Sequence, residues 1–389
     1  MHQIKTLNKI SPVGLSQLNA DAYTVGDNVK DEEGILVRSA EMKSYAFPGS
    51  LLAIARAGAG TNNIPVSKCT EAGIVVFNTP GANANAVKEL AVCAMLVASR
   101  DVVGGAEWVR AQAEAGADVP DVVEKGKSAF TGPELMGKSL GIIGLGAVGV
   151  QVANISTKLG MTVYGYDPFL SVDSALSLSR AVHRVLDLSV IYRTCDYISL
   201  HLPLADSTRG TLNADAFSQM KTGVRIINLA RGELVNDDDL IPALDMGKVA
   251  CYVTDFPNNK ITLMKNVVAI PHLGASSPES EDNCAFMAAE QLREYLENGN
   301  IKNSVNLPAL DQEWNTKTRL AIIHRNIPNM LASFTKILSQ DSVNVETLSN
   351  KSRGEYAYTL LDVNAEIGDS VADEIRAVSG ILRVRVLRR

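Results

Sequence analysis

Apolar residues in the first hundred positions come in short runs, separated by longer segments of mixed composition. The runs predict buried strands at Gly34–Arg38, Leu51–Ala55 and Ile74–Phe77. A long helix with small side chains throughout is predicted over Asn85–Ser99. The segment 116–138 is richer in Gly, Pro, Lys and Asp, and it predicts a connecting loop.

The same alternation continues beyond residue 139. Further strands are predicted at the apolar runs Leu140–Leu145, Thr162–Tyr166, Tyr197–Leu200, Val224–Asn228, Cys251–Asp255 and Val267–Ile270. Strands that alternate with helices imply parallel sheets covered on both faces. Because ligands of such sheets bind beyond the carboxyl ends of the strands, polar residues at these ends are candidates for a site.

The pattern changes at Asn306–Asn315, which contains Pro308, few apolar residues and no periodicity. We therefore predict a domain boundary there. The elements predicted beyond it are a strand, a helix, a hairpin, a helix and a strand, at Leu320–His324, Asn329–Gln340, Val343–Ser349 with Tyr356–Val363, Ser370–Ala377 and Ile381–Leu387. The predicted fold class is α/β, with two Rossmann-like or flavodoxin-like domains of doubly wound parallel sheet and a C-terminal ferredoxin-like βαββαβ domain.

Composition narrows the class of protein. A length of 389 residues with 46% hydrophobic residues favours two or three domains with their own cores. The net charge of −6 and the pI near 5.5 argue against nucleic acid as a partner. We find no apolar run long enough to span a membrane and no secretory signal after Met1, and the five cysteines are far apart. We therefore expect a cytoplasmic protein without a metal.

The strongest chemical signal is a glycine pattern between a predicted strand and a helix, formed by Gly144, Gly146 and Gly149. Gly144 permits a tight turn, and Gly146 lets the backbone approach a pyrophosphate. Gly149 lets the helix pack closely on the strand. The full unit of strand, glycine turn, helix and strand predicts a dinucleotide-binding domain.

The predicted helix after this turn begins at Ala147 and Val148. The backbone N–H groups at this N-terminal end can bind the phosphates of a dinucleotide. Asp167 ends the next predicted strand. Its carboxylate can accept hydrogen bonds from the ribose hydroxyls and would repel a 2′-phosphate. The predicted cofactor is therefore NAD.

Two strand ends carry residues suited to oxidation of a hydroxy acid. Arg231 follows a buried strand, where it can bind a carboxylate bidentately and polarise a carbonyl. The alternative is a surface arginine in a loop. His272 follows the last predicted strand of this region, where it can take a hydroxyl proton as hydride leaves. The alternative is a histidine bonded to the backbone at a strand end.

Other polar residues follow strands with less distinct roles. His201 is interpreted either as a packing residue beside the cofactor or as a chemical group. Asp255 could accept from the nicotinamide amide or cap a helix. Arg56, with Arg38 and Lys43, could meet an anionic substrate, although solvated surface charges explain these residues equally well.

Five stretches of the sequence make the chain similar to the D-isomer-specific 2-hydroxyacid dehydrogenases. The matching stretches are Arg56–Gly58, Asn78–Gly81, Gly137–Gly146, Asn228–Gly232 and Pro271–Ser276. By resemblance Arg231 binds the substrate carboxylate and His272 is the acid/base. The resemblance puts Asp255 near the nicotinamide carboxamide and Asp167 on the adenosine ribose. It adds, on the cofactor side, His201, Pro203, Ala230 and Gly274, and on the substrate side, Arg56, Ala57, Gly58 and Asn78.

The resemblance implies oxidation of 3-phospho-D-glycerate with NAD, giving 3-phosphohydroxypyruvate, at the start of serine synthesis. The domains it implies are substrate binding at 1–97 with 280–305, NAD binding at 98–279, a linker at 306–317 and a regulatory ACT domain at 318–389. It implies a homodimer or homotetramer. Two alternatives remain. The enzyme could oxidise another D-2-hydroxy acid, or the chain could be an NAD-sensing binding protein that has lost its enzymatic activity.

One position departs from the family's pattern. The family has a Glu that holds the catalytic histidine, and counting from Asp255 puts it at Lys260. An ammonium there would disfavour the imidazolium that a carboxylate stabilises. Which acid, if any, supports His272 is open at this stage.

The ACT resemblance implies L-serine as an effector, bound at a subunit interface. The residues it implies are His324, Asn326 and Asn344, which could equally be ordinary polar residues of turns. The family's usual Gly after Pro328 is Asn329, which tolerates a positive φ.

Overall fold

The computed structural model describes residues 1–368 and 370–389, together with the backbone of Asp369. The chain forms two compact units, one of Ala84–Ser280 and one of Met1–Asn83 with Glu281–Arg389. Helix α3 (Ala84–Ser99) lies in the first of these units, whereas residues 1–97 were predicted to form the other domain. The reason is that its small side chains pack against the nucleotide-domain helix α6 (Ala147–Lys158) and against strand β10 (Val224–Asn228).

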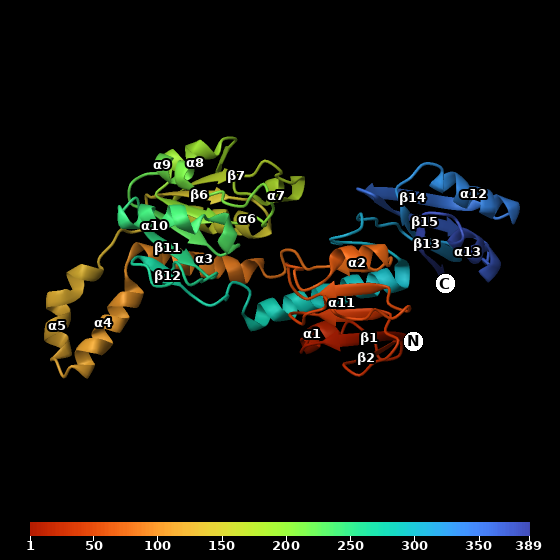
Figure 1. Ribbon diagram of the computed structural model, residues 1–389, viewed down its shortest axis with the longest axis horizontal. Helices are drawn as coiled ribbons and strands as arrows, with labels where there is room; N and C mark the ends of the chain where they lie inside the picture. Colours follow the sequence, from red (N-terminus) through yellow and green to blue (C-terminus); the bar gives the residue numbers. More distant parts are fainter. The chain divides into compact units, whose positions relative to one another are not determined.

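The unit Ala84–Ser280 is built on a seven-stranded parallel sheet in the order β12-β11-β10-β9-β6-β7-β8 (Figure 1). Its other strands are β6 (Ser139–Ile143), β7 (Thr162–Tyr166), β8 (His183–Val185), β9 (Tyr197–Leu200), β11 (Val249–Thr254) and β12 (Val267–Ala269). Successive residues of β6 belong to different hydrophobic clusters, Ile142 to one face and Ile143 to the other. The predicted doubly wound sheet is confirmed.

Helices cover both faces of this sheet. On one face α3 and α6 pack over Leu140 and Ile142, and on the other face lie three helices around Ile143. Those three are α8 (Leu188–Thr194), α9 (Ala214–Gln219) and α10 (Asp237–Asp245). Two short helices, α7 (Val172–Ser177) and η2 (Gly232–Leu234), follow β7 and β10. All the carboxyl ends of the strands therefore point to one edge.

The predicted loop at 116–138 is wrong over much of its length. Residues 102–130 form α4 (Val102–Glu114), α5 (Val119–Gly126) and the 3-10 helix η1 (Lys127–Phe130). Pro120 and the surface lysines of this segment suggested a loop. In the structure Pro120 occupies the first turn of α5, and the lysines form ion pairs with carboxylates three or four residues earlier in the chain. The rings of Trp108 and Phe130 pack 5.4 Å apart and hold the helices together.

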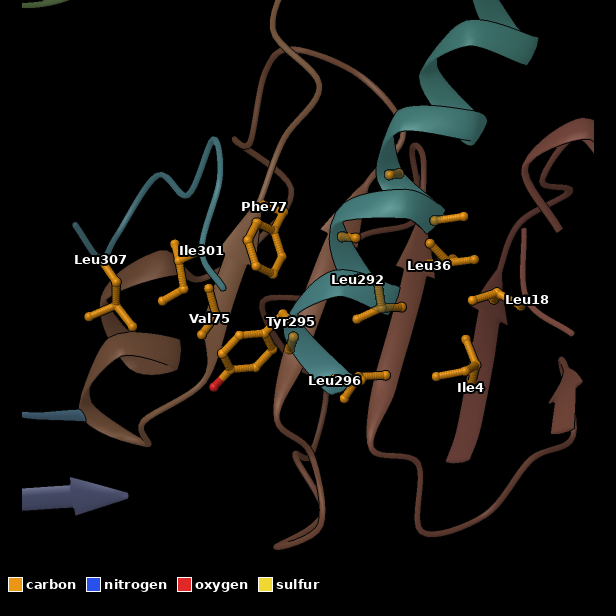
Figure 2. Close-up of a cluster of buried hydrophobic side chains, with 14 of the residues drawn as sticks. Ile4, Leu18, Leu36, Val75, Phe77, Leu292, Tyr295, Leu296, Ile301 and Leu307 are labelled. Carbon is orange, nitrogen blue, oxygen red and sulfur yellow. The ribbon is translucent and has the colours of Figure 1, made fainter. Parts of the chain in front are cut away.

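The other unit begins with a five-stranded parallel sheet in the order β2-β1-β3-β4-β5. Its strands and short helices are β1 (His2–Leu7), α1 (Pro12–Leu15), β2 (Tyr23–Gly26), β3 (Gly34–Val37), β4 (Ala53–Arg56), α2 (Val66–Glu71) and β5 (Val75–Phe77). The long helix α11 (Pro278–Asn298) lies over one face of this sheet. Figure 2 shows Leu292 and Leu296 of α11 facing Ile4 and Leu36 of the sheet. The centroid of the Tyr295 ring lies 5.8 Å from that of the Phe77 ring.

The C-terminal part has the predicted βαββαβ order. It contains β13 (Thr318–Arg325), α12 (Met330–Gln340), β14 (Val345–Arg353), β15 (Tyr356–Val363), α13 (Asp369–Arg376) and β16 (Ile381–Arg388), in an antiparallel sheet of order β14-β15-β13-β16. One face of the sheet packs against α12 and α13. Asn329 takes the left-handed conformation expected for it, with φ 68°.

The other face of the antiparallel sheet is buried in the core that α11 shares with the first sheet. Three side chains of the antiparallel sheet donate hydrogen bonds to backbone carbonyl oxygens at the C-terminal end of α11 and at Gly299, which follows the helix. The bonds run from Arg385 to Tyr295 (2.8 Å) and Leu296 (2.6 Å), from Arg319 to Asn298 (2.8 Å) and from Tyr358 to Gly299 (2.6 Å). Except for the Tyr295 carbonyl, which also accepts the Gly299 N–H at 3.0 Å, these carbonyls lie beyond the last backbone hydrogen bonds of the helix, and cations suit that end of the helix dipole.

The segment predicted as a linker is also part of this core. Leu307, Leu310 and Trp314 are buried, and Leu310 exchanges backbone hydrogen bonds with Ile301. The few apolar residues of 306–317 therefore pack inward. The C-terminal sheet is joined to this unit by packing as well as by the chain.

A buried ion pair within this unit gives a test of stability. Arg319 and Asp362 are both almost fully buried, and two guanidinium nitrogens donate to the carboxylate at 2.6 and 2.7 Å. Arg319→Met should lower the free energy of unfolding by about 3–5 kcal/mol, because it leaves a buried carboxylate without its cation. Urea unfolding measures this. The double variant Arg319→Met with Asp362→Leu should recover much of the loss, and an equal loss in both variants would contradict the ion-pair explanation.

Candidate active site

The glycine turn between β6 and α6 has the geometry that the sequence predicts. Gly144 has φ 96°, and a Cβ added there would lie 2.5 Å from the carbonyl oxygen of His201. A Cβ on Gly149 would lie 1.9 Å from the carbonyl oxygen of Gly144, so only glycine lets α6 approach the turn. At Gly146 a Cβ would meet nothing within 4 Å, which leaves the space in front of α6 open.

The first turn of α6 is suited to a pyrophosphate. The helix starts at Ala147 and Val148, and its N-cap residue Gly146 supplies no side-chain acceptor for their N–H groups. N–H groups of this kind, at the positive end of the helix dipole, bind phosphate oxygens. The residues present therefore fit the diphosphate of a dinucleotide.

The carboxylate of Asp167 is held rigidly at the end of β7. One oxygen accepts the backbone N–H of Leu145 at 2.9 Å, and the other accepts that of Phe169 at 2.8 Å. Each oxygen keeps lone pairs for a ribose hydroxyl. The carboxylate is thus fixed next to the glycine turn, as ribose recognition requires.

This geometry predicts a strong preference for NAD over NADP. The value of kcat/KM should be about 10²-fold or more higher with NAD, because the Asp167 carboxylate would face the 2′-phosphate. Asp167→Ser should reduce that preference. Asp173→Ser, which removes an exposed charge from the nearby helix α7, should leave it unchanged. Equal kcat/KM values for both cofactors in the wild type would refute the role of Asp167.

Arg231 is positioned by a buried amide that the sequence analysis did not identify. Asn228, the last residue of β10, is fully buried. Its side-chain nitrogen donates to the Arg231 carbonyl at 2.8 Å, and its oxygen accepts the N–H groups of Ala230 and Arg231. The only sign of this role in the sequence is that Asn228 is a polar residue at the end of an apolar strand. The Arg231 side chain donates to the Ala230 carbonyl oxygen at 2.6 Å.

Asp255 is fully buried at the end of β11, with one oxygen accepting the Gly274 N–H at 3.0 Å. Its other oxygen, also buried, has no hydrogen-bond partner among the described residues. Burial raises the pKa of this carboxyl, while the Gly274 N–H, His272 and Arg231 pull it back down. A buried acceptor without a donor fits the amide of a nicotinamide, which supplies the missing N–H.

His272 and Asp255 line one pocket of this unit. The pocket also contains both members of an ion pair, in which Lys260 donates to Asp238 at 2.9 Å. That carboxylate raises the pKa of the exposed Lys260 ammonium. The other lining residues are Arg209, Gly210, Gly232, Glu233, Val235, Asn236, Asp237, Phe256, Pro257 and Asn258. Lys260 thus lies in the pocket of His272 with its charge balanced by an aspartate.

His201 is a packing residue with a fixed hydrogen bond. Its Nε2 lies 2.9 Å from the Ser199 hydroxyl, and burial lowers the pKa of His201 to about 4. A ring with so low a pKa is a weak base at pH 7, so it is a poor candidate for the acid/base. Pro203, in the next turn of chain, accepts the Thr208 hydroxyl through its carbonyl oxygen at 2.6 Å.

The residues assigned to the substrate from the first sheet form a group of their own within their unit. Arg56, at the end of β4, donates to the Asn63 side chain at 3.2 Å, and a Cβ on Gly58 would collide with the Arg56 guanidinium. Ala57 is buried beside them. Asn78 donates to the Ala59 carbonyl oxygen at 2.6 Å. These contacts order the loop that carries Arg56.

The three polar residues suggested for an effector differ in exposure. His324 is buried, with Nδ1 donating to the Arg325 carbonyl oxygen at 2.7 Å and Nε2 hydrogen-bonded with the Thr359 hydroxyl at 2.9 Å. Burial lowers its pKa. Asn326 and Asn344 are exposed. Both ring nitrogens of His324 thus have partners inside the domain. The two exposed amides remain accessible, although Asn326 donates to the Gly354 carbonyl oxygen and Asn344 to the Glu346 carboxylate, each at 3.2 Å.

The described residues contain neither a candidate metal-binding cluster nor a helix suited to span a membrane. No group of three or more His, Cys, Asp or Glu in that part of the chain could hold a metal ion. Within the same residues, none of the helices combines the length and the apolar character needed to cross a bilayer.

Residues 92–274 match the NAD-binding domain of the D-isomer specific 2-hydroxyacid dehydrogenases. The D-3-phosphoglycerate dehydrogenase of Haemophilus influenzae is 32% identical over 385 residues, which cover 94% of this chain and 89% of that protein. The chain belongs to the D-isomer-specific 2-hydroxyacid dehydrogenase family. It is therefore an oxidoreductase, and the cofactor of its nucleotide-binding domain is NAD.

Two further relatives extend the likeness. Human D-3-phosphoglycerate dehydrogenase is 35% identical over 300 residues, covering 75% of this chain, which spans only 54% of that protein. The structure of 3-phosphoglycerate dehydrogenase from Entamoeba histolytica with NAD+ bound superposes with a TM-score of 0.61 at 26% identity, covering 79% of this chain and 99% of that one. The α/β fold is thus shared with a solved member of the family.

The arrangement of these residues suits oxidation of a 2-hydroxy acid. When bound, NAD supplies the acceptor for hydride. The Arg231 guanidinium can bind the carboxylate of the hydroxy acid and polarise the carbonyl that forms. The His272 imidazole can accept the hydroxyl proton. Asp255, held by Gly274, can fix the nicotinamide amide.

Proposed function

We propose that this protein oxidises 3-phospho-D-glycerate to 3-phosphohydroxypyruvate with NAD. The observation that carries the proposal is the likeness to the Haemophilus influenzae D-3-phosphoglycerate dehydrogenase over nearly the full length of both chains. Arg231 and His272 are present at the strand ends where a carboxylate clamp and an acid/base are needed. We expect a homodimer or homotetramer in the cytoplasm.

The phosphate of this substrate needs cationic partners. The pocket of His272 does not favour it, because its lining has four carboxylates against the two cations Arg209 and Lys260. We assign the phosphate to the loop that carries Arg56, with Ala57, Gly58 and Asn78 as neighbours. An ordered guanidinium is suited to bidentate binding of phosphate.

A comparison of two substrates tests the proposal. The value of kcat/KM should be about 10²-fold or more higher for 3-phospho-D-glycerate than for D-glycerate, which lacks only the phosphate. Arg56→Ala should remove most of that difference, and a variant of the exposed Lys9, Lys9→Ala, should not. If another D-2-hydroxy acid is oxidised faster than 3-phospho-D-glycerate, the substrate assignment is wrong.

Lys260 supports a second candidate, an NAD-binding protein without turnover. An ammonium in the pocket of the acid/base would disfavour the imidazolium. The ion pair between Lys260 and Asp238 opposes this candidate, because it balances the charge. A protein that binds NADH but oxidises none of a panel of D-2-hydroxy acids would favour the second candidate over the first.

We also propose that L-serine binds the C-terminal domain and lowers activity, in keeping with an ACT domain. The exposed amides of Asn326 and Asn344 are suited to the two charges and the hydroxyl of serine. Since both ring nitrogens of His324 are already bonded, we expect His324 to support the fold of this site. Inhibition requires two states of the protein that bind serine unequally.

Serine titration tests this regulatory proposal. Wild-type activity should fall as serine is added, and Asn326→Ala and Asn344→Ala should shift the response to higher serine concentration. D-serine is the matched control ligand. If activity and serine binding by calorimetry are both flat into the millimolar range, the C-terminal domain has no serine site.

A further inference from the structure

The ring of Phe256 contacts both residues assigned to the chemistry. Phe256 follows Asp255 at the end of β11, and its ring centroid lies 4.6 Å from that of His272, at an interplanar angle of 49°. The guanidinium carbon of Arg231 lies over the same ring, 5.7 Å from its centroid. One aromatic side chain thus lies against the acid/base and the carboxylate clamp.

The backbone of Phe256 is itself fixed. Its N–H donates to the Thr254 hydroxyl at 3.0 Å, and the preceding residue, Asp255, is tied to Gly274. A Cβ on Gly232 would lie 3.4 Å from the Phe256 Cβ, an ordinary contact that places the start of η2 next to Phe256. The Phe256 side chain is half-buried.

No carboxylate is hydrogen-bonded to the His272 ring in the described part of the chain. The residue counted to the family's glutamate position, Lys260, is paired with Asp238. His272 lowers the pKa of the Asp255 carboxyl through its charge, but the hydrogen bond of that carboxyl goes to Gly274. The direct neighbour of the imidazole is the Phe256 ring.

We propose that Phe256 is a positioning residue that holds His272 and Arg231 and stabilises the imidazolium formed when His272 accepts the substrate proton. The inference rests on the proposed dehydrogenase chemistry of this site. The negative face of an aromatic ring attracts a cation that lies against it. The ring thus supports the acid/base at a position where the family's carboxylate is absent.

Several charged groups lie around the imidazole, in addition to the Phe256 ring. They come from each element that lines the pocket, and they are Asp255 after β11, Arg231 before η2, Glu233 in η2, Asp237 and Asp238 in α10, Lys260 after β11 and Arg209. A change at Phe256 leaves all of these charges in place. A shift in the pKa of His272 on such a change therefore reports the ring.

Three variants of the full chain test the role. Phe256→Leu should lower kcat/KM for the oxidised substrate by about tenfold or more, raising KM and lowering kcat together, because both His272 and Arg231 lose support. The acid limb of the kcat/KM profile should move to lower pH. Phe256→Tyr should restore both values. Phe217→Leu, in the core of the same unit, is the matched control for loss of aromatic packing and should leave the profile unmoved.

Nuclear magnetic resonance gives a readout that does not need turnover. The chain has five histidines, so the His272 ring signal can be assigned with His272→Gln. Its pKa should be lower in Phe256→Leu than in the wild type, because a cation loses its aromatic neighbour. The proposal is overturned if the Phe256→Leu variant has the wild-type His272 pKa and loses no more activity than Phe217→Leu. If Phe256→Leu shifts the His272 pKa but the wild-type protein oxidises no hydroxy acid, the effect of the ring on His272 stands and the proposed function is wrong.

Discussion

Replacing His272 by alanine will reduce kcat by about 10²–10⁴-fold, the usual contribution of a positioned acid/base, while NADH binding stays near its wild-type strength. Without the imidazole, the hydroxyl proton must leave to water as hydride is transferred. The residues expected to hold the cofactor, Gly146, Asp167 and Asp255, make none of their hydrogen bonds to the His272 ring. Pre-steady-state kinetics and NADH fluorescence titration measure the two effects separately.

His183→Ala is the matched control. His183 is an exposed histidine on β8 of the same unit, where its ring packs 5.3 Å from Tyr164. This variant should retain wild-type kcat. If His272→Ala turns over at the rate of His183→Ala, His272 has no part in proton transfer.

Replacing Arg231 by alanine will lower kcat/KM by about 10³-fold through both parameters, with KM raised and kcat reduced. A guanidinium that binds the carboxylate in two places both retains the substrate and aligns its reacting carbon. The loop geometry should survive, because Asn228 bonds to the backbone of Arg231 and not to its side chain. Steady-state kinetics in the oxidative direction give both parameters.

Arg231→Lys should recover only part of the loss, since an ammonium cannot bind a carboxylate in the bidentate manner. Arg193→Ala removes an exposed arginine from α8 and serves as the charge control. A raised KM with unchanged kcat in Arg231→Ala would mean that Arg231 binds substrate without aligning it.

Six of the seven strands of the nucleotide-binding sheet could be predicted from the sequence because each is a short apolar run, whereas the edge strand β8 carries His183 and Arg184, is largely exposed, and was missed. Thr162–Tyr166, Tyr197–Leu200 and Val224–Asn228 begin and end where expected. Burial on both faces removes the polar alternation that blurs strand limits in other sheets. The same rule directed attention to the residues after the strands, including Arg231 and His272.

Helices α4 and α5 were missed because none of their residues is buried and because the Gly, Pro, Lys and Asp of 116–138 indicated a loop. Their stability comes from caps, ion pairs and the contact between Trp108 and Phe130, which hydrophobic periodicity does not report. Asn228 and Phe256 escaped notice for a different reason. Their roles depend on contacts with Arg231 and His272 that only the folded loops create.

The hydrogen bonds from Arg385, Arg319 and Tyr358 to the end of α11 bear on how the chain can be divided. A protease that cuts within 306–317 would not release two folded pieces, because the sheet beyond the cut would still cover the helix. A gene shortened at residue 317 would encode a protein with an open apolar face and unbonded helix carbonyls. Insertions and fusions made to change regulation should therefore be placed in the exposed turn at Gly354, and the junction before β13 should be left intact.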